Sequence, residues 1–566
     1  MDRSFFEAKV EVPGLSGFDK SFQNLYTAPV GTIVPALFDE IVGGSTIDLE
    51  MAASCSLPPL ASDTFMRCSL KVEAFFCPMR LCYRGFEHFF VGDEFEVLES
   101  GPDTYKTTTI KSLPSFRFLT PDNGLTEAQL DSAKEVLGAG SLADYLGFKT
   151  QINVGYVSAT GQAPKLSFLP FVAYHKCWSD WYRSSLIQRD CFTAPGNDLD
   201  YASASVSVLP YIVDAEGDFF ARSYALDYSS ASQSGFLLAD GVSLLSLRQR
   251  NFGFDYFTTA TPSPQNGNAQ RVTLDTSNLA QGFTIAQLRS ANAVQQFLER
   301  RNLAGDRYVD RLFAQYGVRP SDGVAQRVLC IASGEFEVYS KGIFENSNNS
   351  TSGQSANPFG GQLGSRGGSA SASGTINICK GFRAAEPGYI FVMTSLVPRV
   401  TYAMGVNRAL LRYVDDNSIG EMANPILQNI GPEPIYCYEL SDPAGLYSQW
   451  DKVFGYTDRY GSFKARTDEL HGLLREGESL SSFAAQRYLD PTADPQIDSE
   501  FLEIPKNYLD NVTAVSGSLS EYGVWCDTYF KYHVSMPLAR YSLPTLQDPA
   551  YEHGKSLTLR RGGFRF

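Results

Sequence analysis

Two stretches of the chain alternate between apolar and polar residues, which predicts half-buried β-strands. The first covers residues 68–76 and is closed by Pro78, and the second covers residues 524–534. One face of the first carries Leu70, Val72, Ala74 and Phe76, and one face of the second carries Val524, Cys526, Thr528, Phe530, Tyr532 and Val534. Strand-like runs also cover residues 327–339 and 388–402. The chain is therefore predicted to be rich in β-structure.

Helical spacing occurs in a few separate segments. Capping boxes open at Thr126 and Thr284, and apolar residues follow each at intervals of three and four. A further helix is predicted over residues 309–316, and the aromatic positions of residues 171–182 have the same spacing. Short strands with long insertions that hold a few helices are typical of sandwich and jelly-roll folds.

Residues 346–374 are rich in Gly, Ser and Asn and contain almost no large apolar side chain. Such a segment does not bury enough surface to fold alone, so it is predicted to be a loop. Strand-like runs lie on both sides of it, and the entropy of loop closure grows slowly with length. One sheet with a long loop is therefore preferred over two domains, and residues 1–566 are treated as a single domain.

Charge narrows the range of partners. The chain has 62 acidic and 47 basic residues, a net charge of −15. Binding to duplex DNA over a broad outer face requires clustered Lys and Arg, so it is not expected. The exception is the C-terminal tail, residues 560–566, where Arg560, Arg561 and Arg565 alternate with glycines and two aromatics. Two alternatives stay open for this tail: it contacts DNA by phosphate neutralisation and base stacking, or it clamps a neighbouring subunit.

Motifs for catalysis are scarce. The sequence has no phosphate-binding loop, no credible serine nucleophile with its partners and no helical pair of histidines. The closest cysteines, Cys77 and Cys82, are separated by four residues, and the ten cysteines are predicted to be buried free thiols. Two opposed glycosidase carboxylates would leave no sequence signature, but solubilising surface acids are the preferred interpretation. No enzyme activity, cofactor or metal site is predicted.

Targeting signals are also missing from the sequence. The first residues lack the apolar segment of a secretory signal, and no run approaches the about 20 apolar residues that a membrane helix needs. We therefore expect a protein that is made in the cytoplasm, with no insertion into a membrane. Unpaired cysteines are in keeping with that compartment.

Several segments resemble, in order along the chain, the major capsid proteins of the Microviridae, the small tailless single-stranded DNA phages, and in particular the gokushovirus type. Residues 255–265, DYFTTATPSPQ, are the most similar segment. The other similar segments are residues 75–81, 86–92, 169–183, 288–291, 305–308, 316–327, 453–460 and 470–472. Each match is weak alone, but their common order along the chain makes the set specific.

The resemblance implies an eight-stranded antiparallel jelly roll with long loop insertions that contain a few α-helices. It also implies self-assembly, through pentamers, into a T=1 icosahedral shell around circular single-stranded DNA in the host bacterial cytoplasm. Exposed loops of the virion would bind a receptor on the host cell surface. A small basic DNA-binding virion protein is implied as well, because a chain with net charge −15 does not neutralise a packaged genome.

Two departures from the family pattern qualify this interpretation. Residues 265–284 are shorter than the insertion that builds the threefold protrusion of gokushoviruses. Either the protrusion is absent, or another segment builds it, such as a surface insertion at residues 193–243 or the loop at residues 346–374. Cys77 and Met79 stand where the family usually has Val and Asn, which indicates a distant relative. The alternative functions are a β-sandwich polysaccharide-binding protein or glycoside hydrolase, and a non-viral shell protein.

Overall fold

The structure is a computed structural model of the chain. It describes residues 7–12, 14–83, 86–92, 94–98, 105–109, 113, 115–116, 138–149, 166–192, 238, 240–263, 289, 321, 326–344, 366–410, 432–440, 452–487, 489, 496–514, 523–538 and 555–560. Only the backbone is described in residues 7–12, 94–98, 105–109, 115–116, 344, 366 and 555–560. The helices predicted at Thr126, at Thr284 and over residues 309–316 lie outside the described residues, as does most of the predicted surface insertion.

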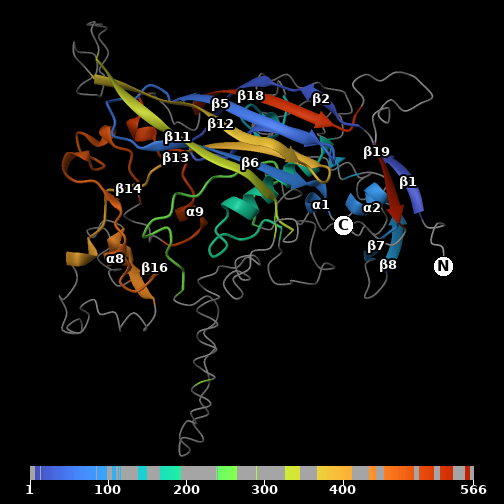
Figure 1. The fold of residues 1–566 in the computed structure, drawn as a ribbon. Helices are drawn as coiled ribbons and strands as arrows, with labels where there is room; N and C mark the ends of the chain where they lie inside the picture. Colours follow the sequence, from blue (N-terminus) through green and yellow to red (C-terminus); the bar gives the residue numbers. More distant parts are fainter. Residues whose placement is uncertain are drawn as a thin grey trace, which may run out of the picture.

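The described part of the chain is dominated by one antiparallel sheet of nine strands (Figure 1). Its strands are β2 (Ser16–Asp19), β3 (Phe22–Ala28), β4 (Val34–Ile41), β5 (Thr46–Ser56), β6 (Cys68–Pro78), β11 (Leu329–Phe344), β12 (Arg366–Arg383), β13 (Gly388–Pro398) and β18 (Val524–Met536). Short strand pairs surround it: β1 (Glu7–Val12) with β19 (Lys555–Arg560), β7 (Glu94–Leu98) with β8 (Tyr105–Thr109), β9 (Ser115–Phe116) with β10 (Leu166–Ser167), β14 (Thr401–Tyr402) with β17 (Asp468–Glu469), and β15 (Glu433–Tyr436) with β16 (Val453–Thr457).

The helices that the structure describes are short. The α-helices are α1 (Met79–Cys82), α2 (Phe86–Val91), α4 (Leu142–Tyr145), α5 (Leu169–Cys177), α8 (Gly461–Lys464) and α9 (Ser499–Leu502), and a π-helical turn, Trp178–Tyr182, continues α5. The 3-10 turns are Arg408–Leu410, Cys437–Glu439, Gly472–Leu474, Ser481–Phe483 and Asp510–Val512. The helix predicted from the aromatic spacing of residues 171–182 is confirmed.

The order of strands across the sheet matches the pairing expected of a jelly roll. β2 and β3 pair with successive parts of β18 and occupy one edge, so the order β2/β3-β18-β5-β12-β11-β6-β13-β4 has eight positions. When the eight positions are numbered by their order along the chain, their order across the sheet is 1-8-3-6-5-4-7-2. Position 1 pairs with 8, 2 with 7, 3 with 6 and 4 with 5, as in a jelly roll. At the two ends of this order β3 and β4 meet, where the Asn24 side chain donates to the carbonyl of Ala36 at 2.7 Å. The sheet therefore curls on itself, in keeping with the predicted mainly β fold.

The main hydrophobic core fills the inside of the curled sheet. The alternation predicted at residues 68–76 and 524–534 is confirmed, because every second side chain of β6 and β18 is buried in this core. Phe530 and Tyr532 from β18 and Ile390 and Val392 from β13 are among its fully buried members.

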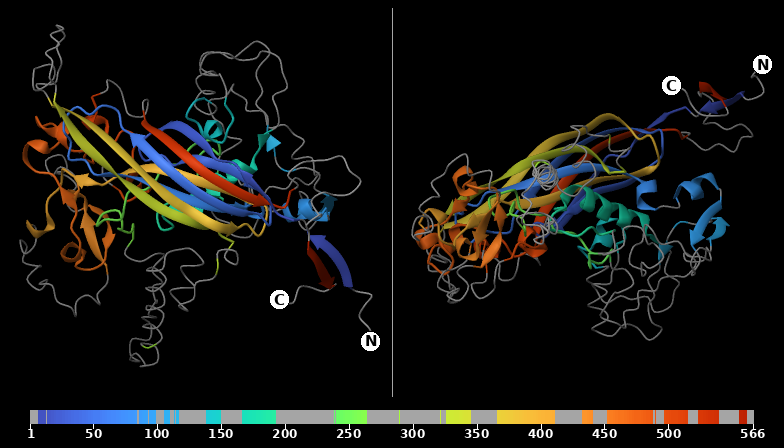
Figure 2. Two further views of the ribbon diagram at one scale, coloured as in Figure 1. Left: turned by 45° about the horizontal axis from the view of Figure 1, so that its top comes forward. Right: turned by 90° about the horizontal axis from the view of Figure 1, so that it is seen from below.

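A second core covers the outer face of β6 and β13. There Phe75 and Phe391 point away from the main core and pack with α5 and its π-helical turn, which lie across this face (Figure 2). The outer faces of β5, β12 and β18 carry exposed residues instead, such as Ser54, Ser373 and Trp525. The sandwich is therefore asymmetric, with one covered and one open face.

Residues 366–374 correct the prediction of a loop over residues 346–374. They form the first half of β12, paired with β11 and β5. Small residues are required here because neighbouring groups fill the space of a side chain. A Cβ on Gly374 would lie 2.3 Å from the ring of Phe336, and one on Gly368 would lie 2.5 Å from the carbonyl oxygen of Ser62. Residues 346–365 lie outside the described residues.

Candidate functional site

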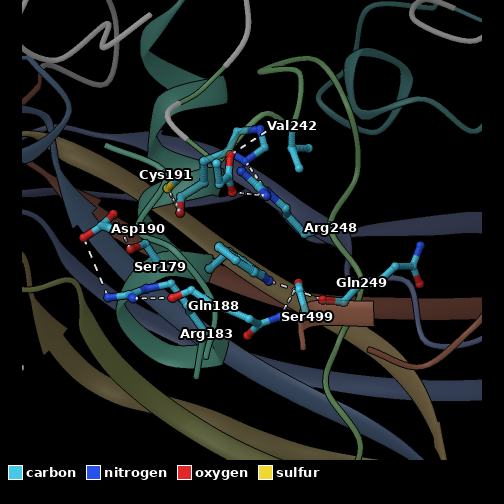
Figure 3. A network of polar contacts seen from close by, with 12 residues as sticks. Ser179, Arg183, Gln188, Asp190, Cys191, Val242, Arg248, Gln249 and Ser499 are labelled. Atoms are coloured by element: carbon cyan, nitrogen blue, oxygen red, sulfur yellow. Dashed lines mark hydrogen bonds and ion pairs between the residues drawn. The ribbon is translucent and has the colours of Figure 1, made fainter. Parts of the chain in front are cut away.

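The first candidate site is a buried polar network that holds both flanks of residues 193–237 against α5 (Figure 3). One flank, residues 190–192, follows the π-helical turn, and the other, residues 240–249, runs back along the covered face of the sheet. Local sequence explains the position of α5. The Ser167 hydroxyl accepts a bond from the Leu169 amide, Pro170 occupies the first turn of α5, and most residues of α5 are buried.

His175 and Arg248 form the centre of this network. The Arg248 Nε donates to His175 Nδ1 at 2.8 Å, so the ring is neutral and its Nε2 donates to the Leu244 carbonyl at 2.8 Å. Arg248 also pairs with Asp240 at 2.6 Å and stacks over the Trp178 ring. Both His175 and Arg248 are buried, so their hydrogen bonds are made away from water. The second flank is thereby fastened to α5.

The first flank is fastened to the same helix through Asp190. Its carboxylate accepts hydrogen bonds from the Ser179 hydroxyl at 3.0 Å and from the Phe192 amide at 3.1 Å, and it faces Arg183 at 3.7 Å. The Cys191 thiol donates to the His175 carbonyl at 3.7 Å. Gln188 extends the network to Glu503 near α9, at 3.1 Å. The sequence analysis assigned no site to these residues, because no motif marks such a network and some partners, such as Gln188 and Glu503, are far apart in the chain.

A partly buried ion pair lies next to this network. Arg250 contacts both carboxylate oxygens of Glu73 at 2.6 and 2.7 Å, and the Tyr182 hydroxyl donates to Glu73 at 2.7 Å. Arg250 also donates to Ser395 on β13. Two parallel hydrogen bonds restrict the orientation of the Arg250 side chain as well as pairing its charge. Arg250 therefore fixes the position of its own segment on β6 and β13.

The neutral state of His175 makes stability depend on pH. Burial, together with the charge of Arg248, holds the pKa of His175 well below its usual value. The unfolded imidazole binds a proton below about pH 6.5 and the folded one does not, so stability should fall as pH drops through that value. We expect a contribution of up to about 1.4 kcal/mol per pH unit between pH 6.5 and the lower folded pKa. Urea unfolding from pH 7.5 to 5 measures it. A His175→Gln variant with an unchanged pH slope would contradict the assignment.

A second feature of the structure is a set of exposed large apolar side chains. Phe254 is 96% exposed, and Phe65, Phe90 and Leu410 are each exposed by more than two thirds. Phe254 lies at a groove of about 1170 Å³ whose lining includes Tyr339 and several ion pairs. The ion pairs of this groove are Lys71–Glu335, Arg399–Asp468 and Lys464–Asp458. Apolar side chains among paired charges are typical of a surface that another protein covers.

The predicted C-terminal tail is only partly described. β19 pairs with β1, and Arg560, its last residue, lies opposite Glu7 in register. Arg561 and Arg565 lie outside the described residues. The β1–β19 ribbon lies at the end of the sheet opposite β14 and β16 (Figures 1 and 2). Strands from near the two ends of the chain thus pair with each other. The role of the three arginines stays a prediction.

The described ranges also contain free cysteine thiols. All ten cysteines fall in these ranges as free thiols, eight of them buried, which agrees with the predicted buried thiols. Over these ranges, no group of three or more His, Cys, Asp or Glu side chains is arranged to hold a metal ion. None of the described helices is long and apolar enough to span a membrane.

Comparison with known proteins places this geometry in a family. A family model described as "Capsid protein (F protein)" matches residues 11–546. The chain is 23% identical to capsid protein VP1 of Chlamydia phage 1, over 97% of this chain and 98% of the relative. It is 24% identical to capsid protein VP1 of Bdellovibrio phage phiMH2K, over 86% and 87%, and 22% identical to that of Spiroplasma virus 4, over 92% and 93%.

The family match bears directly on the predictions from sequence. It confirms the resemblance to the Microviridae major capsid proteins, and it sets aside the glycoside hydrolase, because the family is a structural one without catalysis. Since the family model spans most of its length, the chain belongs to the capsid protein (F protein) family and is a structural component of a bacteriophage virion.

Proposed function

We propose that the chain assembles through pentamers into a small T=1 icosahedral shell that encloses circular single-stranded DNA. The observation that carries the proposal is the exposure of large apolar side chains, above all Phe254, on a subunit with a well-formed core. An isolated protein gains nothing from such exposure, whereas a neighbouring subunit would bury these groups. The paired charges of the Phe254 groove supply both signs, which suits contact with a second copy of the same chain.

Negative-stain electron microscopy with the ratio of absorbance at 260 and 280 nm tests this proposal. Uniform spherical particles with nucleic-acid absorbance are expected when the chain is produced with its genome. Empty shells or pentamers would support assembly and point to a missing packaging partner. A monomer that never associates over a range of salt and pH would overturn the proposal.

We further propose that the C-terminal tail contacts the packaged DNA or a small basic virion protein. Support comes from its three arginines in a chain of net charge −15. Because β19 ends at Arg560, substitutions beyond that residue leave the β1–β19 pairing in place.

The tail proposal predicts an effect on packaging that depends on charge. The Arg561→Ser, Arg565→Ser variant should assemble normally, contain less DNA and lose DNA at lower salt, because fewer phosphates are neutralised. The matched Arg561→Lys, Arg565→Lys variant should behave like the unaltered chain. The measurements are particle yield, absorbance ratio and DNA release against salt. If the Ser variant loses assembly instead, the tail is a clamp between subunits; if nothing changes, the tail has neither role.

We also propose that residues 193–237 carry the contact with the host cell surface. The support is that the described residues on both sides of this segment are anchored to α5 and its π-helical turn, through Asp190 on one side and through Arg248 bound to His175 on the other. Replacing residues 195–235 with a Gly/Ser segment of equal length should leave particles intact and abolish adsorption to the host. Normal adsorption would contradict the proposal.

A further inference from the structure

Two cysteines from opposite ends of the chain face one another inside the sheet. β18 and β5 are antiparallel, and their register places Cys526 directly opposite Cys55. Both side chains point into the main core and are buried. Directly opposed residues of antiparallel strands have Cα atoms about 4.5 or 5.5 Å apart, and disulfides span Cα separations of about 4.4–6.8 Å. The register therefore places the two Cα atoms within the range that a disulfide spans.

The chemistry around this pair favours reaction between the two thiols. Cys55 and Cys526 influence one another's pKa, and Tyr26 on β3 lies opposite Cys526 on its other side. Interaction with the Cys526 thiol lowers the pKa of the Cys55 thiol, and the thiolate is the form that reacts with oxidants. Cys55 is thus suited to react first with an oxidant, with Cys526 in place to attack the oxidised sulfur.

The other close thiols are less suited to a bridge with structural effect. Cys77 and Cys82 have sulfur atoms 3.6 Å apart, but they lie in one short segment, so a bond between them would close a small loop. Cys177 also interacts with Cys77 and lowers its pKa, which leaves two partners in competition for one sulfur. A bond between Cys55 and Cys526 would instead enclose most of the chain, and constraint of the unfolded chain grows with loop size.

We propose that Cys55 and Cys526 are a disulfide-forming pair that closes when the protein meets a peroxide outside a reducing compartment. The Cys55 thiolate attacks one peroxide oxygen, the O–O bond breaks, and a sulfenic acid and hydroxide form. The Cys526 sulfur then attacks the sulfenic sulfur, the new S–S bond forms, and water leaves. Overall two thiols lose two electrons and two protons, and one hydrogen peroxide is reduced to two waters. The bond would fasten the last core strand to an early one.

The test uses the full-length protein, assembled or not, treated with hydrogen peroxide and then blocked with N-ethylmaleimide. We expect a peptide that links Cys55 to Cys526 by mass spectrometry and faster migration on a non-reducing denaturing gel. The change in migration should vanish on reduction and in the Cys55→Ser and Cys526→Ser variants. The matched variant Cys191→Ser, at a buried cysteine that contacts His175, should keep it.

The peptide map of the unaltered chain decides the outcome even if a serine variant fails to fold. The absence of the Cys55–Cys526 peptide at peroxide levels that oxidise other cysteines would overturn the proposal. A map that contains only a Cys77–Cys82 or Cys77–Cys177 link would overturn it as well. This result does not depend on whether the chain forms shells.

Discussion

Replacing Glu73 with alanine should lower the free energy of unfolding by up to about 3–5 kcal/mol, the cost for a fully buried pair, because it leaves the largely buried charge of Arg250 without its partner. The carboxylate accepts two hydrogen bonds from Arg250 and one from Tyr182, and the ion-paired side chains are only 17% and 12% exposed. Water therefore replaces the lost carboxylate only in part. Urea unfolding of the unassembled subunit, followed by circular dichroism, measures the loss.

A nearby carboxylate provides the matched control. Glu335 on β11 pairs with Lys71 on β6, but this pair is more exposed, with side chains 54% and 31% exposed. Exposed ion pairs contribute about 0–1 kcal/mol, so Glu335→Ala should have little effect. Replacing both Glu73 and Arg250 with methionine should recover much of the loss, since no unpaired charge remains. A loss below about 1 kcal/mol for Glu73→Ala would show that Arg250 finds another partner or reaches water.

Glu73 also shows where sequence patterns stop being informative. The alternation of residues 68–76 correctly assigns Leu70 and Val72 to the core, because one face of β6 packs on the inside of the sheet. The same alternation assigns Glu73 to a polar face. That face is covered in the structure by residues 166–192 and 240–250, which come from far along the chain. A period-two pattern reports that two faces differ, not what covers each of them.

Amino-acid composition was misleading for the first half of β12. Glycine and serine over residues 366–374 have the composition of a flexible linker, yet β12 uses them because Phe336 and Ser62 occupy the adjoining space. The distinction depends on neighbours that are distant in sequence. For the same reason, nothing local to His175 or Arg248 could have predicted the network that they form. The family, by contrast, was accessible from sequence because its motifs follow one another in order.

Replacing Phe254 with serine should abolish or strongly weaken assembly and leave the subunit folded. The side chain is 96% exposed, so its loss should change the free energy of unfolding by no more than about 0.5 kcal/mol. The backbone next to Phe254 is held in place by hydrogen bonds of the following residue, Asp255. The Asp255 carboxylate accepts hydrogen bonds from the amides of Phe257 and Thr258 at 2.9 and 2.7 Å. The backbone next to Phe254 is therefore fixed by a hydrogen-bonded turn, so little backbone entropy is lost when a neighbour covers the side chain.

The size of the assembly effect follows from apolar burial. Complete burial of a phenylalanine contributes about 1.5–3 kcal/mol, so its loss from one contact should raise the subunit concentration required for assembly about 10- to 100-fold. Light scattering across a concentration series measures this threshold, and circular dichroism checks the fold. The control Phe254→Leu keeps an apolar group and should assemble at a threshold near that of the unaltered chain. If Phe254→Ser assembled at the unaltered threshold, Phe254 would lie on a surface that the shell leaves open. The contacts between subunits would then have to be sought at the other exposed apolar groups, Phe65, Phe90 and Leu410.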